Sequence, residues 1–330
     1  MFGLNLAIKF GSSEISIYKK GVGIIAKEPA FLAVIENGKK LKVQAVGKAA
    51  EELFHSSSSN ITVYQPIKNA VVENEKMAIL LLAEIVKKSL TNAVSFVNPS
   101  ALVSIPSGLN EEQLKTLKFV LNQAGIGKVV FVANAVCAYA NLDIDKKSHI
   151  MVVDIGKTVT DISVLNGYDL DFGRTYFIGG QTMDESITTF IQDNHNLEVS
   201  DLTSESAKNE VASLYERDLY STEYIGIDEN NKFVKHNITA NEIRVAIQNV
   251  YDTILGLVNE VLKLQPKEIA AEIYSNGVMF VGGGSQISGL YEYAKKKLDM
   301  PIVLPENPMD SVICGAGKLL GVKDFAKIEL

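Results

Sequence analysis

Residues 149–165 read HIMVVDIGKTVTDISVL and decide the fold that the rest of the chain is expected to adopt. The apolar run from Ile150 to Val153 ends in one carboxylate, Asp154, which is typical of a buried strand that brings a single charge to the edge of a sheet. Gly156 then allows a tight turn in which main-chain N–H groups can point at a phosphate. Taken alone, the stretch also fits an ordinary β-hairpin with a solvated aspartate.

A second copy of this pattern lies near the N-terminus, where residues 6–18 read LAIKFGSSEISIY. Aligning Lys9–Gly11 with Asp154–Gly156 also aligns the strands that follow, with the second turn two residues longer. A third glycine cluster, Gly282-Gly283-Gly284-Ser285, follows another apolar run. An internal repeat of this kind predicts two similar halves that face each other across a cleft. Three glycine turns favour a nucleotide as the ligand.

Composition limits the class of protein. With 330 residues, 47% of them hydrophobic, the chain is long enough for two domains with substantial cores. A formal net charge of −7 argues against nucleic acid as a partner. The two cysteines, Cys137 and Cys314, supply neither a disulfide framework nor a CxxC metal site, which favours the reducing cytoplasm. No apolar run reaches the roughly 18 residues that span a bilayer, and the N-terminus does not resemble a signal peptide.

The order of the glycine turns, together with three further segments, resembles the actin-fold ATPases and, among them, the bacterial actins of the MreB family. The further segments are Pro66-Ile67-Lys68-Asn69-Ala70-Val71-Val72, Ile178-Gly179-Gly180 and Ile313-Cys314-Gly315-Ala316-Gly317-Lys318. Sugar kinases and chaperone ATPase domains share the glycine turns, but the PIKNAVV segment and the stretch from Pro266 to Gly284 are similar to MreB in particular. The resemblance covers nearly the whole chain.

This resemblance implies an α/β protein of the actin-like ATPase fold. Two similar RNase H-like domains would flank a nucleotide cleft, and each would carry a smaller inserted subdomain. Domain I would comprise residues 1–142 and 310–330, with its small subdomain at about 33–60. Domain II would comprise residues 143–309, with its small subdomain at about 181–250.

The resemblance also implies which residues bind ATP or ADP. The expected nucleotide-binding residues are Lys9, Gly11, Ser12, Ser13 and Glu14 at the first phosphate turn, Gly156, Lys157 and Thr158 at the second, Gly180, and Gly282, Gly283, Gly284 and Ser285 beneath the adenine. In MreB-like proteins an E-x-x-K pair holds the ribose and adenine, and Glu205 and Lys208 match it. Their spacing places them on one face of a predicted helix, where an isolated pair would be a surface salt bridge.

The catalytic positions depart from the MreB pattern. Asp154 is retained as the carboxylate near Mg²⁺, and Thr160 could add a hydroxyl. Lys9 replaces the aspartate of the first Asp-x-Gly, Lys157 stands within the family's run of glycines, and Asn134 replaces the glutamate that orients water. An amide can hold a water molecule but cannot accept its proton, and losing a general base typically costs about 10² to 10⁴ in rate. We therefore expect slow or absent hydrolysis.

The two lysines at the phosphate turns allow two interpretations. Lys9 and Lys157 could neutralise phosphate charge directly and partly replace Mg²⁺, or they could fill the site and exclude nucleotide. Because the attraction between an ammonium and a phosphate is strong in a partly dry cleft, we favour binding.

The function implied is that of a cytoskeletal filament protein in cell shape, assembling with itself or with like or paralogous subunits. The alternative is a non-polymerising adaptor of the same fold that recruits membrane-associated partners. Lys9 and Asn134 argue against an active phosphotransferase such as a sugar kinase. In MreB-like proteins a loop near residues 91–98 enters the membrane surface, so Val94, Phe96 and Val97 are candidate anchors, or else caps of the core.

Overall fold

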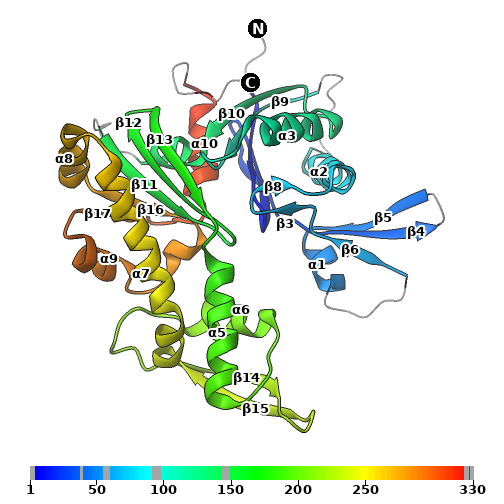
Figure 1. Cartoon of the computed structure of the whole chain (residues 1–330). Helices are drawn as coiled ribbons and strands as arrows, with labels where there is room; N and C mark the ends of the chain where they lie inside the picture. Colours follow the sequence, from blue (N-terminus) through cyan, green and yellow to red (C-terminus); the bar gives the residue numbers. More distant parts are fainter. Residues whose placement is uncertain are drawn as a thin grey trace. The chain divides into compact units, whose positions relative to one another are not determined.

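The structure is a computed structural model that describes residues 4–37, 40–54, 60–90, 98–142, 149–322 and 327. The chain forms two compact units (Figure 1). The first comprises Met1–Lys146, Ser163–Thr175 and Asp310–Leu330, and the second comprises Lys147–Ile162 and Tyr176–Met309. The domain boundaries expected from the family resemblance stay a prediction.

The first unit is built on a five-stranded sheet of order β10-β9-β1-β2-β3. Its strands are β1 (Leu6–Phe10), β2 (Glu14–Lys19), β3 (Gly23–Pro29), β9 (Ser100–Ile105) and β10 (Lys128–Ala133). β2 runs antiparallel to both β1 and β3, whereas β9 runs parallel to β1 and β10. The apolar run from Ala30 to Val34 predicts a third strand there. The structure instead forms β3 before this run, and most of the run belongs to β4 (Leu32–Asn37).

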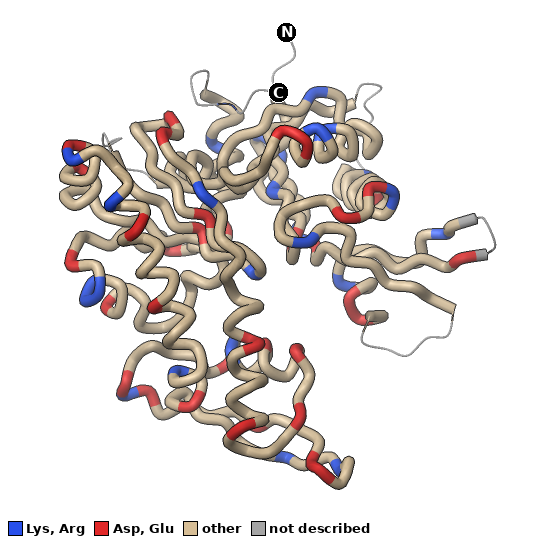
Figure 2. Tube along the Cα trace, viewed as in Figure 1, with Lys and Arg blue, Asp and Glu red and all other residues tan. Residues whose placement is uncertain are grey.

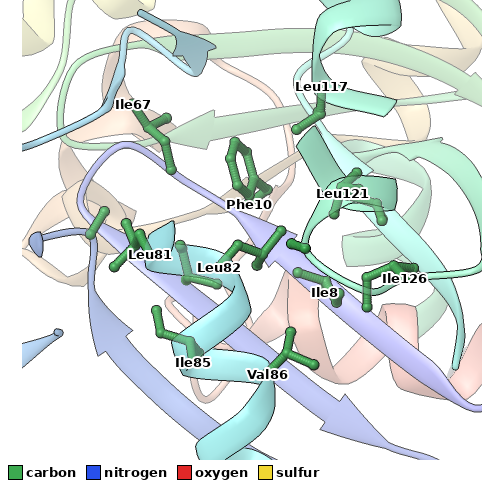
Figure 3. Close-up of a cluster of buried hydrophobic side chains, with 14 of the residues drawn as sticks. Ile8, Phe10, Ile67, Leu81, Leu82, Ile85, Val86, Leu117, Leu121 and Ile126 are labelled. Carbon is green, nitrogen blue, oxygen red and sulfur yellow. The ribbon is translucent and has the colours of Figure 1, made fainter. Parts of the chain in front are cut away.

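The core of this unit follows from the alternation of apolar residues along β1 and their helical spacing on two helices. Leu6, Ile8 and Phe10 are buried on one face of β1, as expected when successive side chains point to opposite faces. Figure 3 shows Ile8 and Phe10 among side chains of α2 (Glu75–Ser89) and α3 (Glu111–Gln123). Each such fully buried side chain contributes roughly 1.5–3 kcal/mol to stability.

The second five-stranded sheet has the order β13-β12-β11-β16-β17. Its strands are β11 (His149–Ile155), β12 (Thr160–Asn166), β13 (Asp169–Tyr176), β16 (Val278–Val281) and β17 (Ile302–Val303). β16 runs parallel to β11 and β17. In both sheets the strands therefore lie in the chain order third, second, first, fourth and fifth, so the internal repeat predicted from the two glycine hairpins is confirmed.

The two glycine turns are also closed in the same way. The Gly11 N–H donates to the Glu14 carbonyl at 3.1 Å, and the Gly156 N–H donates to the Val159 carbonyl at 2.9 Å. The hydrogen-bonded turn spans the same number of residues in both hairpins. Between the strands, however, the second connection has four residues (156–159) and the first has three (11–13), so it is longer by one residue rather than by the expected two.

Each unit carries further elements inserted into this repeat. In the first unit they are a three-stranded sheet of order β5-β4-β6, formed with β5 (Lys40–Val46) and β6 (Thr62–Tyr64), the helix α1 (Lys48–Phe54), and the short hairpin β7 (Ile67–Lys68) and β8 (Val71–Val72). In the second unit they are α5 (Gly180–His195), α6 (Asp201–Val211) and the antiparallel hairpin β14 (Ser221–Ile227) and β15 (Phe233–Thr239) (Figure 1).

The sequence indicates two helix caps, since Asn110 stands before Glu111 and Glu112, and Thr239 stands three residues before Glu242, which is the spacing of a capping box. Both caps are present in the structure. Asn110 caps α3, and Thr239 with Glu242 forms the capping box at the start of α7 (Ala240–Leu264). The second unit also contains α8 (Lys267–Asn276) and α9 (Leu290–Leu298). Sequence reasoning did not predict α8, although the segment that contains it was singled out.

Two helices of the first unit pack in close contact. They are α4 (Asn134–Asn141) and α10 (Ser311–Leu319). A Cβ atom at Gly315 would lie 1.7 Å from the Cys137 carbonyl oxygen, so only glycine allows this approach. Cys137 is fully buried at the contact, whereas Cys314 is partly exposed.

The predicted membrane anchors Val94, Phe96 and Val97 lie outside the described residues. Within the described part of the chain, no helix combines the length and apolar character needed to cross a membrane.

Figure 2 shows acidic and basic residues mixed along the chain.

Candidate functional site

The second glycine turn is bound to the start of α5. The Gly180 N–H donates to the Gly156 carbonyl at 2.9 Å, and the Gln181 N–H donates to the Lys157 carbonyl at 2.6 Å. A Cβ atom at Gly179 would lie 2.5 Å from the Gly156 carbonyl oxygen, so glycine is required at the N-cap of this helix. The backbone of the turn is therefore fixed by main-chain hydrogen bonds.

Asp154 lies beneath the third glycine cluster. It pairs with Val281 across the parallel strands β11 and β16, and only 7% of its surface is exposed. Gly282 adopts a φ of +85°, and a Cβ atom there would lie 2.4 Å from Asp154 Oδ1. A Cβ atom at Gly284 would lie 2.3 Å from Ile155 Cγ2. The cluster is glycine because its backbone packs directly on the strand that carries the carboxylate.

The other predicted residues of this cluster have different surroundings. A Cβ atom at Gly283 would meet no heavy atom within 4 Å. Ser285 is fully buried, and its Oγ donates to the Val281 carbonyl at 2.6 Å. The Tyr251 hydroxyl donates to the Gly284 carbonyl at 2.6 Å. The Ser285 hydroxyl therefore fixes the turn to the end of β16, whereas the backbone at Gly283 is exposed.

Glu205 and Lys208, one turn apart on α6, both reach the glycine turns. Lys157 Nζ donates to both carboxylate oxygens of Glu205, at 3.1 Å and 3.0 Å. Lys208 Nζ donates to Asp184 Oδ1 at 2.6 Å and to the Gly180 carbonyl at 3.2 Å. The two residues of the E-x-x-K pair thus have different partners: Glu205 pairs with the Lys157 ammonium, and Lys208 pairs with the Asp184 carboxylate.

The two ion pairs differ in their exposure to solvent. The side chains of Lys157 and Glu205 are 34% and 31% exposed, whereas those of Lys208 and Asp184 are 14% and 5% exposed. Burial raises the pKa of the Asp184 carboxyl to about 6, against the opposing effect of the Lys208 ammonium. One pair is therefore accessible to a solute and the other is closed.

In the first unit, the turn Gly11-Ser12-Ser13 is tied to two other segments. Ser12 Oγ accepts a hydrogen bond from the Ala70 N–H at 2.7 Å, and the Ser13 carbonyl accepts one from the Ala30 N–H at 2.9 Å. Ala70 has a φ of +61°, which is rare for a residue with a side chain. The PIKNAVV segment therefore holds the first glycine turn through strained backbone.

Lys9 lies on β1 in the middle of a polar row. Its cross-strand neighbours are Ser16 on β2 and Ser104 on β9, and both serines are buried. Glu14 Oε1 accepts a hydrogen bond from Ser16 Oγ at 2.6 Å. The face of the sheet opposite the apolar core is thus polar at the position where the first hairpin carries its lysine.

The three predicted catalytic residues lie in different places. Asn134 begins α4 and is 7% exposed, whereas Asp154 and Thr160 belong to the second unit. Thr160 is fully buried, and its Oγ1 donates to the Ile178 carbonyl at 2.7 Å. The hydroxyl of Thr160 therefore links β12 to the segment before α5.

A model of the family described as MreB/Mbl protein matches residues 3–328. The chain belongs to the MreB/Mbl family. Among curated relatives, the cell shape-determining protein Mbl of Bacillus subtilis is 28% identical over 329 residues, covering 98% of each chain. The cell shape-determining protein MreB of Escherichia coli is 27% identical over 335 residues, covering 98% of this chain and 95% of the relative.

Solved structures confirm the actin-like fold of this MreB/Mbl family member. MreB5 of Spiroplasma citri, solved with ADP and with AMPPNP, matches with a TM-score of 0.86 at 25% identity, covering 95% of both chains. The MamK double helical filament matches with a TM-score of 0.80 at 19% identity, covering 95% of this chain and 97% of MamK. The likeness to MamK shows the fold alone.

Sequence reasoning missed Asp184, which neutralises Lys208 in this MreB/Mbl family member. One signal was available, since Met183 and Ile187 predict that this face of α5 is buried. An acidic residue next to such a face needs a cationic partner, because an unpaired buried charge is costly. The identity of that partner could not be predicted, since α5 and α6 approach each other only in the folded unit.

Proposed function

We propose that this MreB/Mbl family member is a cytoskeletal filament protein of cell shape determination that binds ATP or ADP and hydrolyses it slowly or not at all. The observation that carries the proposal is the match to cell shape-determining relatives over almost the full length of both chains. The likeness to MreB5 structures that hold ADP and AMPPNP supports nucleotide as the ligand.

The residues of the second unit fit a nucleotide. Gly179, Gly282 and Gly284 pack so closely on neighbouring atoms that a Cβ at any of them would clash, which leaves bare backbone at these turns. Lys157 offers a solvent-accessible ammonium for phosphate, and Glu205 offers a carboxylate that could accept ribose hydroxyls. In the first unit, Lys9 and the turn Gly11-Ser12-Ser13 are the proposed phosphate contacts, and their part in binding stays a prediction.

The protein offers few side-chain ligands for a Mg²⁺ ion in this site. Asp154 supplies one carboxylate, and among the described residues no group of three or more His, Cys, Asp or Glu side chains could hold a metal ion. Mg²⁺ bound with a nucleotide is commonly held by one or two carboxylates, phosphates and water, so Asp154 suffices in principle. When bound, the ion would neutralise phosphate charge, a task that Lys9 and Lys157 could share.

Slow hydrolysis follows from Asn134. Its amide can orient a water molecule but cannot accept a proton, so the rate should fall by about 10² to 10⁴ relative to a site with a positioned base. Phosphate release from ATP, measured with and without Asp154→Ala, tests this point. Turnover at a rate ordinary for ATPases that Asp154→Ala abolishes would contradict slow hydrolysis.

A fluorescent ATP analogue, competed by unlabelled ATP, tests nucleotide binding. We expect saturable binding that depends only weakly on Mg²⁺. Binding that requires Mg²⁺ would assign the phosphate charge to the ion rather than to the lysines, and the absence of binding would contradict the nucleotide proposal.

Sedimentation of the purified chain with and without nucleotide tests assembly. Pelleting that rises above a critical concentration supports a filament, whereas a chain that stays in the supernatant under all conditions supports the non-polymerising adaptor. Adding vesicles of anionic lipid to the same assay tests membrane association, with Phe96→Ser as the variant that should weaken it.

A further inference from the structure

The two lysine–carboxylate pairs at the start of α5 are made by neighbouring residues of α6 but differ in how firmly they are held. Lys208 and Asp184 are buried, and Lys208 makes a second hydrogen bond to the Gly180 carbonyl. Lys157 and Glu205 are each about one-third exposed. Breaking a buried pair leaves an uncompensated charge in the protein, whereas an exposed pair contributes little net free energy. The Lys157–Glu205 pair is therefore the one that can exchange partners.

Lys157 is also placed for exchange by its backbone. The carbonyl of Lys157 is fixed to the Gln181 N–H, so the turn itself does not need to move. The lysine side chain is a flexible four-carbon stem, so its ammonium can move while the backbone stays fixed. The ammonium is a compact charge with three hydrogen-bond donors. A rotation of the side chain is enough to move the ammonium from the carboxylate to another anion near the turn.

We propose that Lys157 is the phosphate-recognising cation of the second unit and that Glu205 holds it until a nucleoside diphosphate or triphosphate replaces the carboxylate. This inference rests on the proposed function, because it concerns the same nucleotide. A polyphosphate carries more negative charge than one carboxylate and offers more acceptor oxygens, so it competes successfully for an ammonium that solvent can reach. The released Glu205 carboxylate is then free to accept hydrogen bonds from the ribose.

The exchange makes a specific demand on the nucleotide. A nucleoside without phosphates gives Lys157 no new partner, so its ribose must compete with the ammonium for Glu205. A polyphosphate without a nucleoside must compete with Glu205 for the ammonium. Only a molecule with both parts satisfies both groups at once, and binding of the two parts is therefore coupled.

Calorimetric titration with ATP, adenosine and inorganic tripolyphosphate tests this exchange. Lys157→Gln should weaken tripolyphosphate binding by about tenfold or more, which is the usual effect of losing a hydrogen bond between charged groups. The same variant should leave adenosine binding unchanged or strengthen it. Glu205→Gln should strengthen tripolyphosphate binding several-fold, because the ammonium loses its competitor while no ribose is involved.

Two further variants serve as controls. Lys235→Gln removes the same charge from another exposed lysine–glutamate pair, Lys235 with Glu223 at 2.8 Å on the β14–β15 hairpin, and should leave all three affinities unchanged. Lys157→Arg keeps the cation and should retain most of the affinity for tripolyphosphate. Circular dichroism confirms that each variant is folded.

The outcomes separate the two proposals. If the unmodified protein binds neither ATP nor tripolyphosphate, the nucleotide part of the proposed function fails and this inference fails with it. If it binds ATP but Lys157→Gln leaves tripolyphosphate affinity unchanged, only the inference is overturned. Tighter ATP binding by Lys157→Gln would also overturn it, because Lys157 would then obstruct the site.

Discussion

The two glycine hairpins share a backbone but differ in chemistry. Lys9 on β1 pairs with Ser104 on β9, and Asp154 on β11 pairs with Val281 on β16, so the two charged residues occupy equivalent places in equivalent sheets. The residue that follows Ser104 is the buried Ile105, whereas the residue that follows Val281 is Gly282, with a φ of +85°.

The fold requires some features of these hairpins and leaves others open. The turn hydrogen bond and the glycine that makes it are present in both hairpins, because a tight reversal at the end of a buried strand depends on them. The charged residue before the turn is not fixed by the fold, since a lysine and an aspartate both occupy that place. The architecture therefore does not dictate whether this residue is a lysine or an aspartate.

The largest effect is expected from Gly282→Ala. This glycine, packed against Asp154 and Ile155, has no counterpart beside the first hairpin, where Ile105 takes its place. The new Cβ would lie 2.4 Å from both Asp154 Oδ1 and the Ile155 carbonyl oxygen, in a backbone conformation that L-residues avoid. Overpacking and backbone strain together should lower the free energy of unfolding by roughly 2–5 kcal/mol. Urea denaturation measures the loss.

Gly283→Ala is the matched control for this variant. A Cβ atom there meets nothing within 4 Å, so its stability should stay close to that of the unmodified protein. Equal stability of the two variants would show that Asp154 and Ile155 move aside easily, and the close packing would then not explain the glycine.

The next largest effect is a pH dependence of stability that arises at Asp184. This residue lies on α5, the helix that is hydrogen-bonded to the second glycine turn. The pKa of Asp184 is raised to about 6 from 3.8, so between these values the folded protein holds a proton that the unfolded chain has released. Stability from this group is therefore present below about pH 4 and is lost as pH rises through about 6. The loss should be on the order of 2–3 kcal/mol.

Asp184→Asn isolates this dependence from that of other carboxyl groups. The stability of the unmodified protein minus that of the variant should fall between pH 4 and pH 7 in denaturant titrations. A difference that stays constant, or rises with pH, would mean that Lys208 rather than burial dominates the ionisation of Asp184.

A smaller effect compares the equivalent glycines directly. A Cβ at Gly11 would lie 2.8 Å from the Glu14 carbonyl oxygen, and one at Gly156 would lie 3.0 Å from the Val159 carbonyl oxygen. Each alanine variant should lose roughly 1–2 kcal/mol, in the lower part of the range for overpacking, with the greater loss at Gly11. Thermal unfolding measures the loss. Gly256→Ala is the control, because a Cβ there, on α7, would lie in open space. If one hairpin tolerates alanine and the other does not, the two turns are not equivalent.

The smallest expected effect comes from making the two hairpins chemically alike. Lys9→Asp gives the first hairpin the carboxylate of the MreB pattern, which repels bare phosphate and attracts a divalent cation. ATP affinity should then depend several-fold on Mg²⁺, which corresponds to about 1 kcal/mol or less. Lys118→Asp reverses the charge of an exposed lysine on α3 and should show no such dependence. The same Mg²⁺ dependence in both variants would assign the effect to net charge.

The sequence predicted most of the fold because its signals are local or repeated. The two glycine hairpins and the caps of α3 and α7 follow from patterns within a few residues or from the internal repeat. β3, which carries a lysine and a glutamate among its apolar residues, and α8, which has one buried side chain, gave weak periodicity and were missed.

The site was predictable only as a set of positions. Glycine patterns and the family resemblance indicated Asp154, Gly156, Glu205 and Lys208, but the partner of each charge depends on how helices pack. The pairing of Lys157 with Glu205, and of Lys208 with Asp184, joins residues that are distant in sequence. No local pattern specifies such pairs, and whether these positions bind nucleotide stays a prediction.

The close packing of α4 on α10 has a consequence for thiol chemistry. Burial strongly raises the pKa of the Cys137 thiol, and Gly315 packs against the main-chain carbonyl of the same residue. The pKa of the Cys314 thiol is raised by the same cause, but this side chain is partly exposed. Since the sequence holds only these two cysteines, a maleimide dye at alkaline pH would attach to Cys314 alone in the folded protein. The unmodified chain thus provides its own single labelling position, in the first turn of α10.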